Sequence, residues 1–449
     1  MRPLRVAVVG SGPAGLYAAA ELAGHEDVSV DLLDRLPTPY GLVRYGVAPD
    51  HFKIKSVVET LRRVLDNERV RFLGNVELGS DLTVAELHRH YDAFVVAVGA
   101  SRDRRLGVQG EDLPGSFSAT EFVAWYSGHP DAAVDRFTLD ARSVAVLGVG
   151  NVAVDVARIM AKTAAELQHT DVPDHVLKVL ASSQVQDVYV IGRRGAAHAK
   201  FTTKELRDLG ELANADVVVE PSELELDEQT EAMLADSPVA RRNLAVLTEW
   251  SQRPAQGRPR RLHLRFLLRP TAITGSAQVE GLTLARGRLV DGEVRDTGEQ
   301  LHLPVQMVLR SIGYRGSPLP DLPFDEERGV VPNSAGRILR DGASVPGQYV
   351  AGWIKRGPSG IIGTNRLDAQ ETVQSLLDDA ADLPVVERPG PDAVLGLLRE
   401  RGVRVVEQPG WEAIDRLEID NGRPRGADRV KITDRGVMLT TALAAQADN

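Results

Sequence analysis

The sequence predicts an α/β fold in which helices pack against parallel sheets. Along its 449 residues, short apolar segments alternate with glycine-containing turns and with segments whose apolar residues recur at helical spacing. A glycine-rich turn directly follows a short apolar segment twice, at Gly10 and at Gly148, and gives the chain a long-period internal repeat. At roughly 150 residues per domain, the length suits about three domain-sized units, or two with one of them split. Together these observations favour two similar α/β units in one chain.

The composition excludes several classes of protein. Hydrophobic residues make up 43% of the chain and charged residues 26%, as in an average soluble protein, which argues against a disordered or low-complexity chain. The 53 basic and 63 acidic residues give a formal net charge of −10, which disfavours a general binder of nucleic acid or of anionic membranes. The first residues enter a strand-and-loop pattern directly, without a recognisable targeting peptide, so we expect a cytoplasmic protein.

The absence of cysteine has the sharpest consequence. A chain without cysteine has no disulfide, no catalytic thiol, no CxxC pair and no iron–sulfur cluster held by cysteine alone. Any redox chemistry then depends on a cofactor that needs no sulfur ligand. We also expect no metal site, because the His88-Arg89-His90 stretch is interpreted as a solvated helix face rather than as a pair of ligands.

The expected elements follow the order of an α/β repeat. Before residue 143 we predict strands at 4–9, 28–33 and 93–98 and helices at 13–23 and 51–67. From residue 143 onward we predict strands at 143–147, 188–191 and 347–352, a polar and mainly helical region at 222–258, antiparallel strands at 260–268 and 279–296, and a helix at 367–379. A stretch rich in Pro, Gly and Asp at 318–332 is interpreted as a linker between domains.

The first glycine-rich loop has the GxGxxG pattern between a strand and a helix. Its first glycine permits a tight turn, its second lets backbone N–H groups approach a pyrophosphate, and its third lets the helix pack closely on the strand. The candidate contacts are Gly10, Gly12, Pro13, Ala14 and Gly15. Asp34 ends the next predicted strand, where an acid is expected to bind a ribose hydroxyl. An acid at this position favours FAD or NAD over NADP; the alternative interpretation is an ordinary glycine-rich turn.

The second loop has the GxGxxA pattern, an allowed variant of the same motif. The candidate contacts are Gly148, Gly150, Asn151, Val152 and Ala153. The following strand ends in Arg193 and Arg194 rather than in an acid, and two guanidiniums suit a ribose 2′-phosphate. This unit is therefore predicted to prefer NADP(H), although the two arginines would also be compatible with a solvated turn. Two such Rossmann-like dinucleotide-binding domains suggest that NADPH delivers hydride to a flavin, which passes electrons onward.

Longer motifs resemble one known family. They lie at residues 36–51 (LPTPYGLVRYGVAPDH), 122–126, 150–158, 201–206, 352–365 and 411–425. These segments resemble the adrenodoxin reductase-like ferredoxin–NADP⁺ reductases, including their actinobacterial members, and the resemblance extends from about Val6 to about Met438. Two positions depart from the usual pattern, because Tyr40 replaces a Phe and Asp34 replaces a Glu. The shorter aspartate implies a longer or water-mediated contact with the ribose.

The resemblance implies a domain organisation and a set of site residues. The NADPH domain, residues 102–315, is inserted into a discontinuous FAD domain that comprises residues 1–101 and 316–449. FAD is bound non-covalently, with Ala14 at the pyrophosphate and with Leu42 and Val76 contacting FAD through main chain. Further flavin and nicotinamide contacts are implied for Trp353, Gly360, Ile361 and Ile362.

The resemblance also places His51 and Glu205 beside the junction of flavin and nicotinamide. Hydride transfer needs no general base, so we expect the two residues to position the nicotinamide and to manage protons. The alternative for His51 is a residue that only precedes a helix.

The implied acceptor is an acidic ferredoxin or a similar electron carrier. An acidic reductase needs a local basic surface to bind such a partner. The candidate surface consists of Arg241, Arg242, Arg253, Arg258, Arg260, Arg261 and Arg265, which are also compatible with ordinary solvated charge. Two other functions stay open: an NADPH diaphorase or quinone reductase on the same scaffold, and a redox sensor that binds FAD and NADP without useful turnover.

Overall fold

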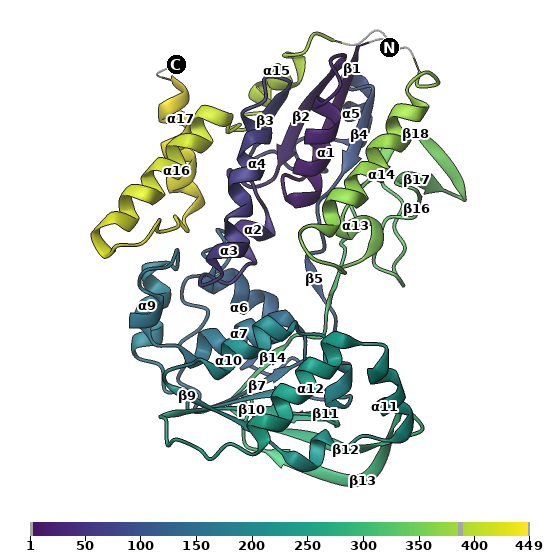
Figure 1. Ribbon diagram of the computed structural model, residues 1–449. Coiled ribbons are helices and arrows are strands. Elements are labelled where there is room, and N and C mark those ends of the chain that lie inside the picture. Colours follow the sequence, from purple (N-terminus) through teal and green to yellow (C-terminus); the bar gives the residue numbers. More distant parts are fainter. Residues whose placement is uncertain (1–2, 385–388, 448–449) are drawn as a thin grey trace. The chain divides into compact units, whose positions relative to one another are not determined.

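The computed structural model describes residues 3–384 and 389–447 (Figure 1). The chain forms two compact units, each with its own sheet and hydrophobic core. The first unit comprises Met1–Asp103 and Gly313–Asn449, and the second comprises Arg104–Ile312. Within the described ranges, no helix is long and apolar enough to cross a membrane.

The first unit is built on a seven-stranded sheet in the order β16-β17-β18-β4-β1-β2-β3. Its parallel strands are β18 (Ala343–Val350), β4 (Ala93–Val96), β1 (Leu4–Val9), β2 (Val28–Asp34) and β3 (Val70–Gly74). The short β16 (Asn333–Ser334) and β17 (Arg337–Arg340) pair antiparallel at one edge. Val9 lies in register between Leu33 and Val96, so the loops that follow β1, β2 and β4 leave the sheet at the same edge.

Helices cover both faces of this sheet, because successive residues of a buried strand point to opposite sides. On one face, Val6 and Val8 share a core with α1 (Pro13–Ala23), α4 (Val57–Leu65) and α14 (Thr364–Asp379). On the other face, Ala7 and Val9 share a core with α5 (Val84–His90) and α15 (Ala393–Glu400). The predicted buried strand at residues 4–9 is therefore confirmed.

The C-terminal helices α16 (Gln408–Gly422) and α17 (Arg435–Ala447) pack against each other. They join the first of these two cores through Trp411, Ile414 and Met438. The shorter helices of the first unit are α2 (Leu42–Tyr45), α3 (Phe52–Lys55) and α13 (Trp353–Arg356). The continuous helix predicted at residues 51–67 is wrong in one respect, because the chain divides it at Ser56 into α3 and α4.

The interpretation of His88-Arg89-His90 as a solvated face is also wrong for one residue. His90 is buried at the end of α5, and its burial, together with the charges of Arg5 and Arg89, lowers the pKa of its imidazole. His88 is half-buried and forms a hydrogen bond of 2.8 Å with the Gln348 side chain. The reason is that α5 packs this side against the sheet rather than toward solvent.

Two short strands mark where the chain leaves and re-enters the first unit. β5 (Arg102–Asp103) pairs antiparallel with β15 (Tyr314–Arg315), with Asp103 opposite Tyr314. A hydrogen bond of 2.8 Å between the hydroxyls of Ser101 and Ser317 adds to this pairing. The two points at which the second unit is inserted into the first unit therefore lie side by side.

The second unit contains a six-stranded parallel sheet in the order β6-β14-β7-β8-β10-β9. Its strands are β6 (Ser116–Ser118), β14 (Met307–Arg310), β7 (Ser143–Leu147), β8 (Asp187–Ile191), β10 (Arg260–Arg265) and β9 (Ala215–Val219). The antiparallel pairing predicted for residues 260–268 is therefore wrong for β10, which lies between β8 and β9 and runs parallel to both. Alternating burial of Leu262 and Leu264 fits either direction, so the sequence pattern could not distinguish them.

A second, three-stranded antiparallel sheet covers one face of this parallel sheet. It consists of β11 (Leu268–Thr274), β12 (Gly281–Val290) and β13 (Glu293–Leu303), and it shares a core with Ala145 and Leu147 of β7. Helices cover the opposite face, where Val144 and Val146 are buried. The helices of the second unit are α6 (Ala119–Tyr126), α7 (Asn151–Ala161), α8 (Ala164–Leu167), α9 (Asp174–Ala181), α10 (Thr203–Gly210), α11 (Glu228–Ala235) and α12 (Pro238–Ser251).

Candidate functional site

The first glycine-rich loop lies at the carboxyl end of β1 and needs glycine at two positions. Gly10 has a φ of +107°, and a Cβ there would lie 2.6 Å from the Ala97 carbonyl oxygen. A Cβ at Gly15 would lie 1.8 Å from the Gly10 carbonyl oxygen, which no side chain can tolerate. These contacts let α1 start directly above the sheet edge, as the motif predicts.

The N-terminus of α1 is available to an anion. Its N-cap residue is Gly12, Pro13 occupies the first turn, and neither a capping side chain nor an acidic residue covers the first N–H groups of this helix. Such a helix end carries partial positive charge and binds phosphate readily. The predicted contact residue Ala14 lies in this first turn.

Asp34 ties the end of β2 to the glycine-rich loop. Its Oδ2 accepts hydrogen bonds from the Ser11 N–H at 2.8 Å and from the Ser11 hydroxyl at 2.6 Å, and its Oδ1 accepts one from the Leu36 N–H at 2.9 Å. Burial raises the pKa of this carboxyl, and the hydrogen bonds from Ser11 and Leu36 oppose that rise. Asp34 thus organises the loop in addition to the ribose contact that the sequence predicts.

The segment that follows Asp34 lies across the glycine-rich loop. Tyr40 donates its N–H to the Ser11 carbonyl oxygen at 3.0 Å, and a Cβ at Gly41 would come within 2.9 Å of the Gly12 Cα. Leu42 begins α2 and is 48% exposed. Val76 is buried, and its N–H is taken by the Asp34 carbonyl oxygen at 2.8 Å. The Val76 N–H is therefore occupied, so a main-chain contact between Val76 and FAD would have to use the Val76 carbonyl.

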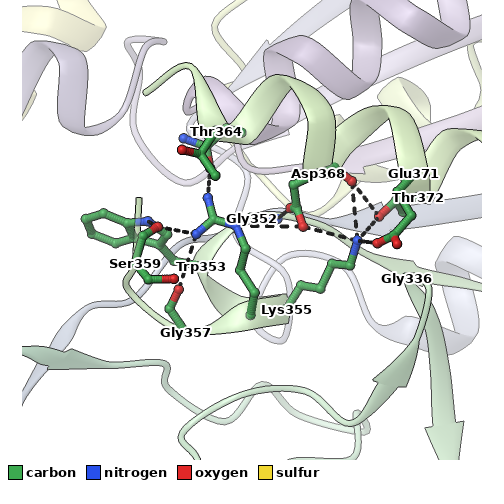
Figure 2. A network of polar contacts seen from close by, with 12 residues as sticks. Gly336, Gly352, Trp353, Lys355, Gly357, Ser359, Thr364, Asp368, Glu371 and Thr372 are labelled. Carbon is green, nitrogen blue, oxygen red and sulfur yellow. Dashed lines mark hydrogen bonds and ion pairs between the residues drawn. The ribbon is translucent and has the colours of Figure 1, made fainter. Parts of the chain in front are cut away.

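Trp353 begins the short helix α13 shortly after β18, and a loop then leads from α13 to α14 (Figure 2). The indole N–H donates to the Ser359 carbonyl oxygen at 3.2 Å, and its ring stacks on Tyr314 with 5.9 Å between centroids. Gly360 has a φ of +82°, and a Cβ there would lie 2.6 Å from the Thr364 hydroxyl oxygen. This hydroxyl accepts the Ile361 N–H at 3.1 Å. Ile361 is 70% exposed and Ile362 half-buried, so the loop presents main chain and an apolar side chain outward.

Two cations that the sequence reasoning missed hold this loop in place (Figure 2). The Lys355 Nζ lies 3.1 Å from Asp368 Oδ1, 2.6 Å from Glu371 Oε2 and 3.0 Å from the Thr372 hydroxyl. The other carboxylate oxygen of Asp368 accepts the N–H of Gly352, which lies in the turn between β18 and α13. The available signal was the Lys-Arg pair directly after Trp353 and Ile354, followed by acids on the next helix.

Arg356, the second of these cations, fixes the far side of the same loop. It donates to the Ser359 carbonyl oxygen and, at 2.7 Å, to the Asn365 side-chain oxygen. Ser359 therefore receives both the indole of Trp353 and the guanidinium of Arg356 on one carbonyl. The loop is held by residues on its two flanks, which leaves its tip free to approach a ligand.

The second glycine-rich loop repeats the geometry of the first. Gly148 has a φ of +137°, and a Cβ there would lie 2.1 Å from the Ser311 carbonyl oxygen. Gly150 is the N-cap of α7, with open space where its Cβ would lie, and no side chain caps this helix. Ala153 is fully buried and packs in the core, so its role is the close helix packing that the motif requires.

Asn151 and Val152 begin α7 and are both half-buried. The Asn151 side-chain oxygen accepts the Thr202 N–H at 2.8 Å, so Asn151 ties the loop to the segment that leads into α10. Thr202 is the N-cap of α10, and its hydroxyl accepts the Glu205 N–H at 3.3 Å. Asn151 therefore helps to position Glu205 through Thr202, in addition to forming part of the second glycine-rich loop.

Glu205 receives a further partner from α7. Its Oε2 lies 3.4 Å from Arg158 Nη1, and Arg158 Nη2 lies 2.8 Å from Asp155 Oδ1. Arg158 is 2% exposed. Sequence reasoning missed Arg158, although an Asp and an Arg three positions apart on one helix face are a recognisable pair.

Arg193 and Arg194 follow β8, and both are exposed. Their turn is fixed through main chain, because the Leu267 N–H donates to the Arg194 carbonyl oxygen at 3.2 Å. Among the described residues, no carboxylate forms an ion pair with either guanidinium. The two cations are thus available to an anionic group. His51, in the first unit, is the N-cap of α3 but makes no side-chain capping bond there.

Of the arginines in the predicted basic surface, two are exposed and form no ion pair with any described residue. Arg260 donates to the Met160 and Lys162 carbonyl oxygens at 2.9 and 2.8 Å, at the end of α7, so its guanidinium is already engaged by main chain. Other members are occupied as well: Arg261 pairs with Asp187, Arg265 with Glu223, Arg253 with Glu249, and Arg258 with backbone carbonyls and Asp216. Arg241 and Arg242 are exposed on α12 and form no ion pair with any described residue.

The comparisons with known proteins agree with this geometry. A family model described as pyridine nucleotide-disulphide oxidoreductase matches residues 4–211, although this chain has no cysteine for a disulphide. The chain is 43% identical to the NADPH-ferredoxin reductase FprA of Mycobacterium tuberculosis, over 99% of this chain and 100% of that protein. It is 40% identical to the mitochondrial NADPH:adrenodoxin oxidoreductase of Arabidopsis thaliana, over 98% of this chain and 96% of that protein.

A solved structure, Mycobacterium tuberculosis FprA in complex with NADPH, superposes with a TM-score of 0.93 at 42% identity and covers 98% of this chain and 100% of its own. The near-complete coverage extends the likeness well beyond the two glycine-rich loops. The chain belongs to the adrenodoxin reductase-like family of NADPH-ferredoxin reductases.

Proposed function

We propose that the chain is an NADPH-ferredoxin reductase that oxidises NADPH and delivers its two electrons singly to two ferredoxin molecules. The overall reaction balances as NADPH plus two oxidised ferredoxins giving NADP⁺, a proton and two reduced ferredoxins. The observation that carries the proposal is the presence of two uncapped glycine-rich helix starts at the ends of two parallel sheets, one followed by Asp34 and the other by Arg193 and Arg194.

The family implies FAD, and the first unit fits it. The open N-terminus of α1 suits the pyrophosphate, Asp34 lies where the adenosine ribose is expected, and the loop from Trp353 to Ile362 presents backbone and apolar surface. When bound, FAD supplies the conversion between a two-electron hydride donor and a one-electron acceptor. The residues that would hold it are Gly10, Gly12, Pro13, Ala14, Gly15, Asp34, Leu42, Val76, Trp353, Gly360, Ile361 and Ile362.

NADPH is assigned to the second unit. The open N-terminus of α7 suits its pyrophosphate, and the unpaired Arg193 and Arg194 suit the 2′-phosphate, which carries nearly two negative charges. An acid at this place would repel that group. The same two arginines thereby provide the preference for NADPH over NADH.

Glu205 and His51 are assigned to the nicotinamide end of the reaction, as the family resemblance implies. The Arg158 guanidinium lies 3.4 Å from the Glu205 carboxylate and helps to fix the direction of that side chain. Hydride leaves the nicotinamide without a general base, so both side chains position the ring and handle protons. Their substitution is expected to affect reduction by NADPH and to leave FAD binding intact.

Ferredoxin is assigned to the surface around Arg241 and Arg242. Arg242 lines a surface cavity of about 480 Å³ together with Lys204 and Arg207 of α10, the helix that carries Glu205. The acids Asp208 and Glu211 line the same cavity, so the cations exceed the acids by one. A basic surface of this kind attracts an acidic partner despite the net charge of −10.

An anaerobic titration of the purified chain with NADPH, followed by absorption, tests the proposal. We expect an oxidised flavin spectrum that bleaches on addition of about one equivalent of NADPH. Steady-state turnover with a ferredoxin and with small quinones then separates a ferredoxin reductase from a diaphorase. A chain without flavin, or one whose flavin stays oxidised with excess NADPH, would refute the proposed reaction.

A further inference from the structure

The loop that crosses the first glycine-rich turn is anchored by residues almost 400 positions later in the chain. Arg44 lies on α2, and its Nη2 forms an ion pair with Oε1 of Glu418 on α16. Both side chains are inside the protein, because Arg44 is 5% exposed and Glu418 is 0% exposed. This pair lies within the first unit and outside the segments that the glycine-rich motif describes.

Two further contacts fasten Arg44 to the C-terminal segment, and a third, within that segment, holds its partner Glu418. The Lys431 Nζ donates to the Arg44 carbonyl oxygen at 2.7 Å, and the Ile432 N–H donates to Glu418 Oε1 at 2.9 Å. The Arg44 guanidinium carbon lies 5.2 Å from the centroid of the Trp411 ring. Charge, hydrogen bonding and cation–π contact thus converge on one residue of the loop.

Trp411 continues the connection to the glycine-rich turn. Its ring meets the Tyr40 ring edge-to-face, with 5.8 Å between centroids. Tyr40 has a φ of +80°, which is unusual for a residue with a side chain. The next residue, Gly41, packs closely against the backbone of Gly12. A strained residue keeps such a conformation only where its surroundings determine it, and here the surroundings are α16 and the Arg44 cluster.

We infer that residues 408–432 form part of the FAD site, with Glu418 and Arg44 as positioning residues that hold Gly41 and Leu42 against the pyrophosphate loop. The inference rests on the assignment of FAD to the first unit. Loss of the Glu418 charge leaves the Arg44 guanidinium buried without its counter-ion, so the loop leaves its place above Gly12. FAD then dissociates more readily, while the nucleotide site in the second unit is unaffected.

The test uses the purified FAD-loaded chain and follows the release of FAD by the rise in flavin fluorescence on dilution. Glu418→Gln keeps the size and the acceptor oxygen but removes the charge, and we expect the FAD dissociation constant to rise at least about tenfold. Asp420→Asn is the matched control, because Asp420 lies on the same helix in an exposed ion pair with Arg423. We expect it to stay within about twofold of the parent.

Two measurements separate positioning from general stability. Melting temperatures with and without added FAD should show that Glu418→Gln loses part of the stabilisation that FAD provides, whereas a merely structural role lowers both values equally. The affinity for NADP⁺ should match the parent. Lys431→Met, which removes the bond to the Arg44 carbonyl oxygen and spares the buried pair, is the second variant if Glu418→Gln does not fold.

The outcomes distinguish this inference from the proposed function. Parent-like FAD binding by folded Glu418→Gln and Lys431→Met would overturn the inference while the reductase assignment stands. A parent chain that binds FAD tightly but does not reduce ferredoxin would refute the assigned reaction and leave the positioning role intact. A parent chain that binds no FAD would overturn both.

Discussion

The Arg158 guanidinium lies 3.4 Å from the Glu205 carboxylate, and both residues belong to the second unit. Arg158 is on α7, the helix that begins at the second glycine-rich loop, whereas Glu205 is on α10. The bond between Asn151 and the Thr202 N–H joins the same two helices at their N-termini. The position of Glu205 is therefore set by the helix whose start is assigned to the nucleotide.

Glu205→Ala and His51→Ala should each slow the reduction of the bound flavin by NADPH by ~10- to 100-fold, since a small misplacement of reacting groups has effects of this size. Stopped-flow absorption under anaerobic conditions measures the rate, and the flavin content measures retained FAD. Glu228→Ala, at an exposed position at the start of α11, is the control and should react as the parent does. Parent rates in both variants would show that neither residue acts at the nicotinamide.

Replacement of both Arg193 and Arg194 by Ala should weaken the preference for NADPH. Each charge-assisted hydrogen bond to a phosphate contributes roughly 1.5–3 kcal/mol, so the double variant is expected to raise KM for NADPH by at least about 100-fold. KM for NADH, which lacks the 2′-phosphate, should change little. Steady-state kinetics with both nucleotides give the ratio, with Arg253→Ala as an exposed-arginine control. An equal effect on the two nucleotides would place the 2′-phosphate elsewhere.

Ferredoxin reduction should slow steeply as ionic strength rises, because salt screens the attraction between a basic surface and an acidic partner. The Arg241→Ala, Arg242→Ala double variant should flatten this dependence and leave reduction of a small quinone unchanged. Arg260→Ala should behave differently, with lower stability and an unchanged salt slope, since Arg260 caps α7. An unaltered slope in the double variant would exclude this surface.

The lowered pKa of Glu86 leads us to expect that the free energy of unfolding decreases in acid. Its hydrogen bond with Arg401 is the main cause that lowers the pKa of this carboxyl from 4.5 to about 2. A carboxyl with a lowered folded-state pKa stabilises the fold above pH 4.5, and this contribution disappears as the pH falls from 4.5 to about 2. Glu86→Gln should cost ~1 kcal/mol at neutral pH and remove part of the acid sensitivity, as measured by denaturant unfolding across that range. Parallel pH profiles for parent and variant would contradict this.

Much of the first site could be predicted because its signals are local. The strand predicted at 28–33 extends through Asp34, and Gly10, Gly15 and Gly148 occupy positions where a Cβ would collide with a carbonyl oxygen. The glycine spacing is a local signal within one strand, turn and helix, although the carbonyl oxygens that exclude a Cβ at Gly10 and Gly148 belong to the distant Ala97 and Ser311.

The residues that sequence reasoning missed are held by partners distant in the chain. Nothing near Arg44 indicates Glu418, 374 residues later, and nothing near Arg260 indicates that the end of α7 takes its guanidinium. The predicted direction of β10 was wrong for a similar reason, because the alternation of buried and exposed residues is the same in a parallel and an antiparallel strand. Long-range pairing of charges and strands is determined by the assembled core rather than by any local pattern.

The pairing of β18 with β4 also dictates an order of events during synthesis. Tyr349 lies opposite Val95, 254 residues earlier, so the sheet of the first unit lacks an internal strand until the ribosome has made all of the second unit. The second unit, whose sheet strands all lie between Ser116 and Arg310, is complete well before that moment. We therefore expect that the inserted unit can complete its sheet on the emerging chain while β4 still has an unpaired edge.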